Sequence, residues 1–150
     1  VAVPGGVPPP PGKCRFHAFL AHDWGSSGQT HVRVAAINRA LQRRGIRTWF
    51  DEERLTGNLL SETCAGIDAS AVFVAFVTRR YMRKVGGADA DDYCQMEFDY
   101  ARRRLGRARM VAACLELRAS DPRRWDGPVG MVLGSKIYAP LWAPARGSHS

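Results

Sequence analysis

The feature that most constrains the fold is an unbroken apolar run, AVFVAFV, at residues 71–77. A run of this length suits one strand, and a strand without polar alternation is buried on both faces, as in the middle of a parallel sheet. Other strand-like runs lie before and after it, at 16–21, 46–50, 110–117 and 136–141. We therefore expect an α/β fold with a mostly parallel five-stranded sheet and helices on both faces.

The spacing of apolar residues between these strands predicts three helices, at 30–44, 59–70 and 93–105. Thr30 is expected to cap the first helix and Gly45 to end it. The third helix has a core stripe at Cys94, Phe98, Ala101 and Leu105. Residues 78–92 are predicted to form a long loop, whereas 118–134 is rich in turn residues and gives no clear pattern.

Composition and charge limit the classes of partner. Of 150 residues, 45% are hydrophobic and 24% are charged, as in ordinary soluble domains, and no apolar run approaches the roughly 18 residues of a membrane span. The net charge of +8 raises the question of nucleic acid. The arginines are spread along the chain, however, and the densest run, at 102–109, has no interleaved aromatic side chains. We therefore expect neither a membrane nor a nucleic acid as partner.

The cysteines indicate the redox environment of the protein, and the composition of the chain ends indicates the limits of the domain. Four widely spaced cysteines without a CxxC pair predict neither a metal site nor a disulfide framework, but buried thiols in the cytoplasm. Five prolines and three glycines among the first twelve residues predict a flexible lead-in over 1–13. A single domain is expected over 14–142, followed by a flexible tail over 143–150.

Ligands of wound parallel sheets bind beyond the carboxyl ends of the strands. The loops after Ala21, Phe50 and Val77 are therefore expected to meet at one edge, together with the helix start at Tyr93. A receiver-like phosphoacceptor domain has a similar sheet but needs an aspartate at the end of its central strand. Val77 and Thr78 stand there instead, which excludes that alternative.

Three segments, in order, resemble the Toll/interleukin-receptor (TIR) domain family: FHAFLAHDWG (16–25), RRGIRTWFDEERLTGNLLSETCAGIDASAVFVAFVTRRY (43–81) and YCQMEFDYA (93–101). The resemblance covers about residues 16–117 and implies a flavodoxin-like fold. It also implies cleavage of NAD⁺, as substrate and not as cofactor, to nicotinamide and linear or cyclic ADP-ribose. Self-association with other TIR domains in immune or stress signalling is implied too. Some members act only as adaptors, so a non-enzymatic adaptor is the alternative.

Glu97 holds the position that is catalytic in the family, at the start of the third predicted helix. Because the nicotinamide of NAD⁺ is already cationic and leaves as a neutral amine, no general acid has to protonate it. One carboxylate is then enough to stabilise the oxocarbenium-like ribose and to hold its hydroxyls. We expect Glu97 to open into a crevice beside the loop 22–29, and the alternative is a solvated helix glutamate.

The resemblance also indicates substrate-binding residues, which are His22, Asp23, Trp24, Gly25, Gly57 and Tyr93. Tyr93 stands where many active relatives carry tryptophan and could stack on a ring of the substrate, or simply pin the helix. The glycines before the first helix would let the backbone approach a phosphate at the helix N-terminus. Asp23 stands where plant relatives often carry arginine, and an arginine from elsewhere could substitute for it. His17 and His31 are expected to be structural or solvent-facing.

Overall fold

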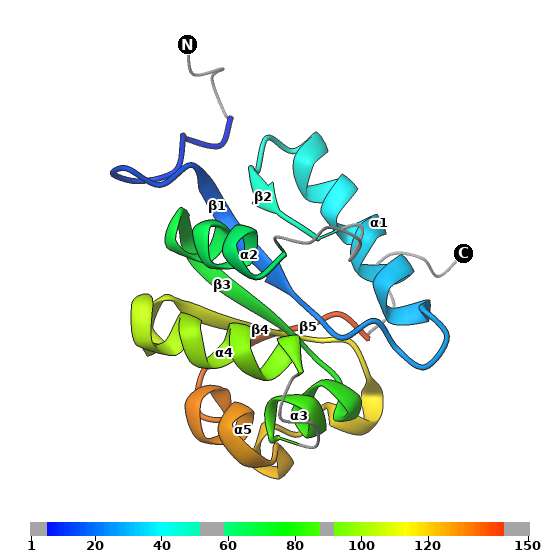
Figure 1. Cartoon of the computed structure of the whole chain (residues 1–150). Helices are drawn as coiled ribbons and strands as arrows, with labels where there is room; N and C mark the ends of the chain where they lie inside the picture. Colours follow the sequence, from blue (N-terminus) through cyan, green and yellow to red (C-terminus); the bar gives the residue numbers. More distant parts are fainter. Residues whose placement is uncertain (1–5, 52–58, 88–91, 143–150) are drawn as a thin grey trace, which may run out of the picture.

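The computed structural model describes residues 6–51, 59–87 and 92–142. Five strands form one parallel sheet in the order β2-β1-β3-β4-β5 (Figure 1). They are β1 (Phe16–Ala21), β2 (Thr48–Trp49), β3 (Ser70–Val77), β4 (Met110–Cys114) and β5 (Tyr138–Pro140). This is the flavodoxin-like order, and the apolar run at 71–77 forms the central strand. The predicted fold class is confirmed, although most strands are shorter than the apolar runs that predicted them.

The helices of the described residues are α1 (Gln29–Arg43), α2 (Leu59–Asp68), α3 (Arg79–Val85), α4 (Tyr93–Arg104) and α5 (Gly127–Leu133), with short 3-10 turns at Arg107–Arg109, Leu117–Ala119 and Pro122–Arg124. The prediction of a long loop over 78–92 was wrong, because α3 follows β3 directly. Its N-cap is Thr78, whose hydroxyl accepts a hydrogen bond from the Tyr81 N–H at 3.0 Å. The predicted cap at Thr30 was also wrong, since Gly28, with φ of 82°, precedes α1 without a side-chain cap.

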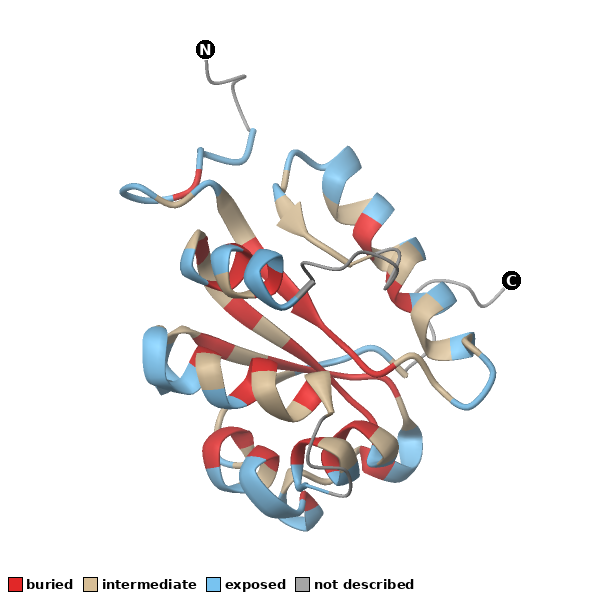
Figure 2. Cartoon of the chain, in the orientation of Figure 1, coloured by how far each residue is buried: buried red, intermediate tan, exposed pale blue. Residues whose placement is uncertain are grey.

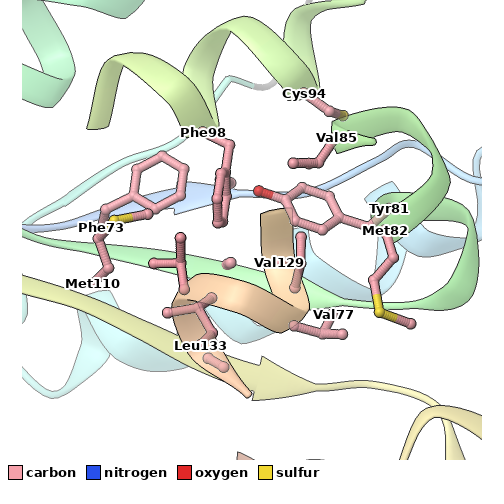
Figure 3. Close-up of a cluster of buried hydrophobic side chains, with 14 of the residues drawn as sticks. Phe73, Val77, Tyr81, Met82, Val85, Cys94, Phe98, Met110, Val129 and Leu133 are labelled. Carbon is pink, nitrogen blue, oxygen red and sulfur yellow. The ribbon is translucent and has the colours of Figure 1, made fainter. Parts of the chain in front are cut away.

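The core lies on both faces of the sheet, because alternate residues of each strand point to opposite sides. On one face, Phe19 and Phe73 pack with buried residues of α2 to α5. Figure 3 shows the centre of this cluster, where Phe98 of α4 and Tyr81 of α3 meet above the strands. On the other face, Leu20 and Phe76 pack with α1. Figure 2 shows the resulting band of buried residues along the central strands, and helices cover both faces as expected.

All four cysteines are free thiols. Cys94 and Cys114 are buried as expected, but Cys14 and Cys64 are only half-buried. Within the described residues, no helix combines the length and the apolar character needed to cross a membrane.

Candidate functional site

The ends of three strands and the start of α4 meet at the carboxyl edge of the sheet. The Thr78 hydroxyl after β3 donates to Asp23 Oδ1 after β1 at 2.8 Å. The ring of His22 stacks on Phe50, just after β2, with a centroid distance of 5.1 Å. The Cys94 thiol of α4 reaches the His22 carbonyl oxygen at 3.7 Å. The predicted meeting is therefore confirmed for the loops after Ala21 and Val77, the strand end at Phe50 and the start of α4, whereas the loop after Phe50 lies, from residue 52 on, outside the described residues.

Asp23 fixes the loop that follows β1. Its side chain is fully buried, and its Oδ2 accepts the Gly25 N–H at 2.8 Å. The same oxygen lies 3.4 Å from Nε of Arg80, an α3 residue whose side chain is 41% exposed. A buried carboxylate with these three protein partners is well satisfied. Asp23 thus anchors the loop. It stands at the position where plant relatives often carry arginine, and it holds Arg80 of α3 beside that position.

Trp24 and His22 belong to a ring cluster that sequence reasoning did not foresee. Trp24 stacks on His31 of α1 with a centroid distance of 3.7 Å. His22 Nε2 lies 2.8 Å from His31 Nδ1, so one of these two nitrogens donates and the other accepts. His31 is therefore part of the loop's structure and not simply solvent-facing. Its position on the first turn of a helix carries no signal of this partner, which comes from the preceding loop.

His17 is structural, as expected. Its Nδ1 accepts the Arg47 N–H at 2.9 Å, and its Nε2 lies 2.6 Å from the Pro8 carbonyl oxygen. Gly25 has φ of 85°, and a Cβ there would lie 2.7 Å from Oε1 of Gln29, so the tight turn before α1 requires glycine. Gly57, the remaining glycine assigned to the site, lies outside the described residues.

Glu97 is the fifth residue of α4, and its side chain is buried, with 9% exposed. It lines a cavity of about 230 Å³ between α2 and α4, together with Tyr93 one turn earlier. The described lining residues are Leu60, Thr63, Cys64, Ile67, Tyr93, Met96, Glu97, Asp99, Tyr100 and Arg103. The alternative of a solvated glutamate is thereby wrong.

The cavity differs in one respect from the expected crevice. Its described lining residues come from α2 and α4, and those of the loop 22–29 are not among them. The contact between α4 and that loop is made instead by Cys94, which lies one residue after Tyr93 on the helix. The family resemblance singled out Glu97, but it could not tell which neighbouring element covers that face of the helix.

Two ionisable groups near the start of α4, Tyr81 and Asp92, have shifted pKa values. Burial raises the pKa of Tyr81 well above its usual value, and its acidic neighbours Glu97 and Asp23 raise it further. Glu97 and Asp23 thus both act on the same buried ring, which keeps its proton. For Asp92, burial alone would raise the pKa, but the Cys94 N–H at 2.7 Å and Lys84 Nζ at 3.1 Å hold it below its ordinary value. The start of α4 therefore carries an ionised cap.

Within the described part of the chain, no group of three or more His, Cys, Asp or Glu side chains is placed to hold a metal ion.

Comparison with known proteins places this geometry in a family. The model of the TIR domain family matches residues 19–145. The solved TIR domains of the activated Roq1 resistosome, which directly recognises the pathogen effector XopQ, are similar to this chain with a TM-score of 0.54 and 20% identity. That match covers 75% of this chain and 64% of the Roq1 chain. No curated protein matches. The chain belongs to the TIR domain family, and its fold is the one that the three sequence segments implied.

Proposed function

We propose that this TIR domain cleaves the bond between nicotinamide and ribose in NAD⁺, with Glu97 as the catalytic carboxylate. The observation that carries the proposal is the burial of Glu97 in the wall of a cavity that also contains Tyr93. Burying a carboxylate costs free energy that only pairing or hydrogen bonding offsets, so a buried carboxylate in the wall of a cavity is a candidate for a functional group. A fixed negative charge at low dielectric stabilises a cation that develops beside it, which is the charge of the ribose as nicotinamide leaves.

The cavity fits part of the dinucleotide. Its volume of about 230 Å³ is below the roughly 300–1,000 Å³ of pockets that hold a whole drug-sized ligand. We therefore assign it to the ribose and the nicotinamide ring, with Tyr93 available for stacking. The pyrophosphate and the adenosine then lie outside it, toward the loop that Asp23 anchors. The products are nicotinamide and linear or cyclic ADP-ribose.

Association of several copies is part of the proposal. The similar Roq1 TIR domains were solved within an activated resistosome, and the family resemblance implies that neighbouring protomers complete the site. We infer that this domain acts in TIR signalling through contacts with other TIR domains, in the reducing cytoplasm that suits its four free thiols.

The proposal is tested by nicotinamide release from NAD⁺ at high protein concentration, so that associated copies are present. Glu97→Ala and Glu97→Gln are expected to lower the rate by about 10²–10³-fold, because each removes the charge that stabilises the transition state. Glu62→Gln, at an exposed glutamate of α2, is the matched control and should keep full activity. Circular dichroism verifies that each variant is folded.

Equal turnover by wild-type protein and the Glu97 variants would refute this mechanism. Absence of nicotinamide release from clustered wild-type protein would favour the adaptor function, in which the domain acts only through its surface.

A further inference from the structure

Thr63 of α2 presents a polar group that the described part of the chain leaves unsatisfied. Its side chain is buried, with 3% exposed, and its hydroxyl oxygen has no hydrogen-bond partner within the described residues. A threonine in a helix usually bonds the carbonyl oxygen four residues earlier, and this one does not. Buried hydroxyls without partners are rare in folded proteins because each costs free energy. The hydroxyl therefore calls for a partner that the described residues do not supply.

The place of this hydroxyl indicates the partner. Thr63 lines the same cavity as Glu97, from the opposite helix. The Tyr81 hydroxyl is also buried without a partner among the described residues, but it points into the apolar core beside Phe98 (Figure 3) and lines no part of that cavity. Thr63 is thus the unsatisfied hydroxyl that faces the proposed substrate site.

We propose that Thr63 binds the ribose on which Glu97 acts. A sugar hydroxyl both donates and accepts hydrogen bonds, whereas an ionised carboxylate only accepts. Glu97 can therefore take the protons of the sugar hydroxyls but cannot satisfy their oxygens. The Thr63 hydroxyl supplies the missing donor from the α2 side of the cavity. This inference rests on the proposed NAD⁺ cleavage and adds a substrate-binding residue that the three TIR-like segments did not single out.

The first test compares Thr63→Val with Thr63→Ser. Valine has nearly the shape of threonine without its hydroxyl, so we expect the KM for NAD⁺ to rise roughly three- to tenfold with kcat nearly unchanged. Serine keeps the hydroxyl and should restore a KM close to that of the wild type. Because the hydroxyl has no partner among the described residues, Thr63→Val should not lower the melting temperature of the ligand-free protein.

Thr48→Val is the matched control. The Thr48 hydroxyl donates to the Asn38 side chain between β2 and α1, so its loss should lower the melting temperature and leave the KM unchanged. If Thr63→Val instead behaves like Thr48→Val, with a lower melting temperature and an unchanged KM, the hydroxyl is structural and the inference is overturned.

A second test identifies the contact with the sugar. NAD⁺ analogues that lack either hydroxyl of the nicotinamide ribose are titrated, by calorimetry, into the Glu97→Gln protein with and without Thr63→Val. If Thr63 binds one ribose hydroxyl, Thr63→Val should not weaken binding of the analogue that lacks this hydroxyl, because the contact is already absent from that complex. A penalty that persists with both analogues shows that Thr63 does not contact the ribose.

The two hypotheses fail in different ways. Wild-type turnover together with an unaffected Thr63→Val variant overturns the role of Thr63 and leaves the proposed function standing. NAD⁺ that binds in a Thr63-dependent way without being cleaved refutes the catalysis and supports the binding contact. Absence of both cleavage and binding overturns both.

Discussion

At the first turn of α4, the Asp92 carboxylate accepts the Cys94 N–H and lies beside Lys84. Replacing this cap in Asp92→Ala should lower the free energy of unfolding by about 1 kcal/mol. Asp92→Asn should cost less at pH 7, because asparagine caps helices but loses the charge. Urea unfolding monitored by circular dichroism measures both effects.

The charge contribution of Asp92 depends on pH in a defined direction. Its pKa in the folded protein is below the ordinary value of 3.8, so folding favours the ionised form. The stability from that charge is fully present above pH 3.8 and is lost as the pH falls through the lower pKa of the folded state. The difference between wild type and Asp92→Asn should therefore shrink in acid. A difference that stays constant down to about pH 2 would show that the charge contributes nothing.

Single residues were predictable where their role follows from the helix or strand that carries them. Tyr93 and Glu97 are four residues apart, so their presence in one cavity follows from helix geometry. The contacts of Arg80 and His31 were not predictable, because each depends on a neighbour from another element. The same holds for the Thr63 hydroxyl, which finds no partner among the described residues. Asp23 and Thr78, for example, are 55 positions apart in the sequence. A repeating apolar pattern identifies a buried face but not the residues that meet it.

Between elements, the contact of α2 with β2 is unusually close. A Cβ on Gly66 of α2 would lie 2.6 Å from Nε1 of Trp49, and the Trp49 ring is held against Phe19 by stacking at 4.5 Å. Alanine in place of glycine favours a helix by about 1 kcal/mol, whereas overpacking a core costs about 1–3 kcal/mol. We expect the second effect to dominate, so that Gly66→Ala is destabilising.

Thermal unfolding of Gly66→Ala, alone and combined with Trp49→Phe, measures this contact. The smaller ring should relieve the clash, so the alanine penalty should decrease in the Trp49→Phe background. A Gly66→Ala protein that is more stable than the wild type would mean that α2 can move away from the sheet at little cost.

At the scale of elements, the strands and the three longer helices were predictable from apolar periodicity. The helices α3 and α5 were missed because each has seven residues, too few for a repeating pattern to emerge. The N-cap at Thr78 was the available signal for α3, since threonine at the end of a strand can begin a helix. Within 118–134, Pro128 near the start of α5 is a comparable signal, because proline is favoured in a first helical turn.

The whole molecule carries a net charge of +8, which bears on the proposed self-association. Copies of like charge repel, and salt screens this repulsion over a Debye length of about 10 Å at 0.1 M. Raising the salt concentration from about 0.05 M to about 0.3 M should therefore strengthen association and, with it, nicotinamide release per protomer. Sedimentation velocity across this range measures the first effect. Association that weakens with salt would instead indicate an interface built on opposite charges.

The two strands at the borders of the sheet are very short. β2 has two residues, and β5 has three, the last of which, Pro140, lacks an N–H group. Little backbone is left there for another polypeptide to extend the sheet. Growth of a continuous fibril through these borders is therefore disfavoured. Protomers that gather would have to meet through side chains of helices and loops, which leaves each one able to separate again with its fold intact.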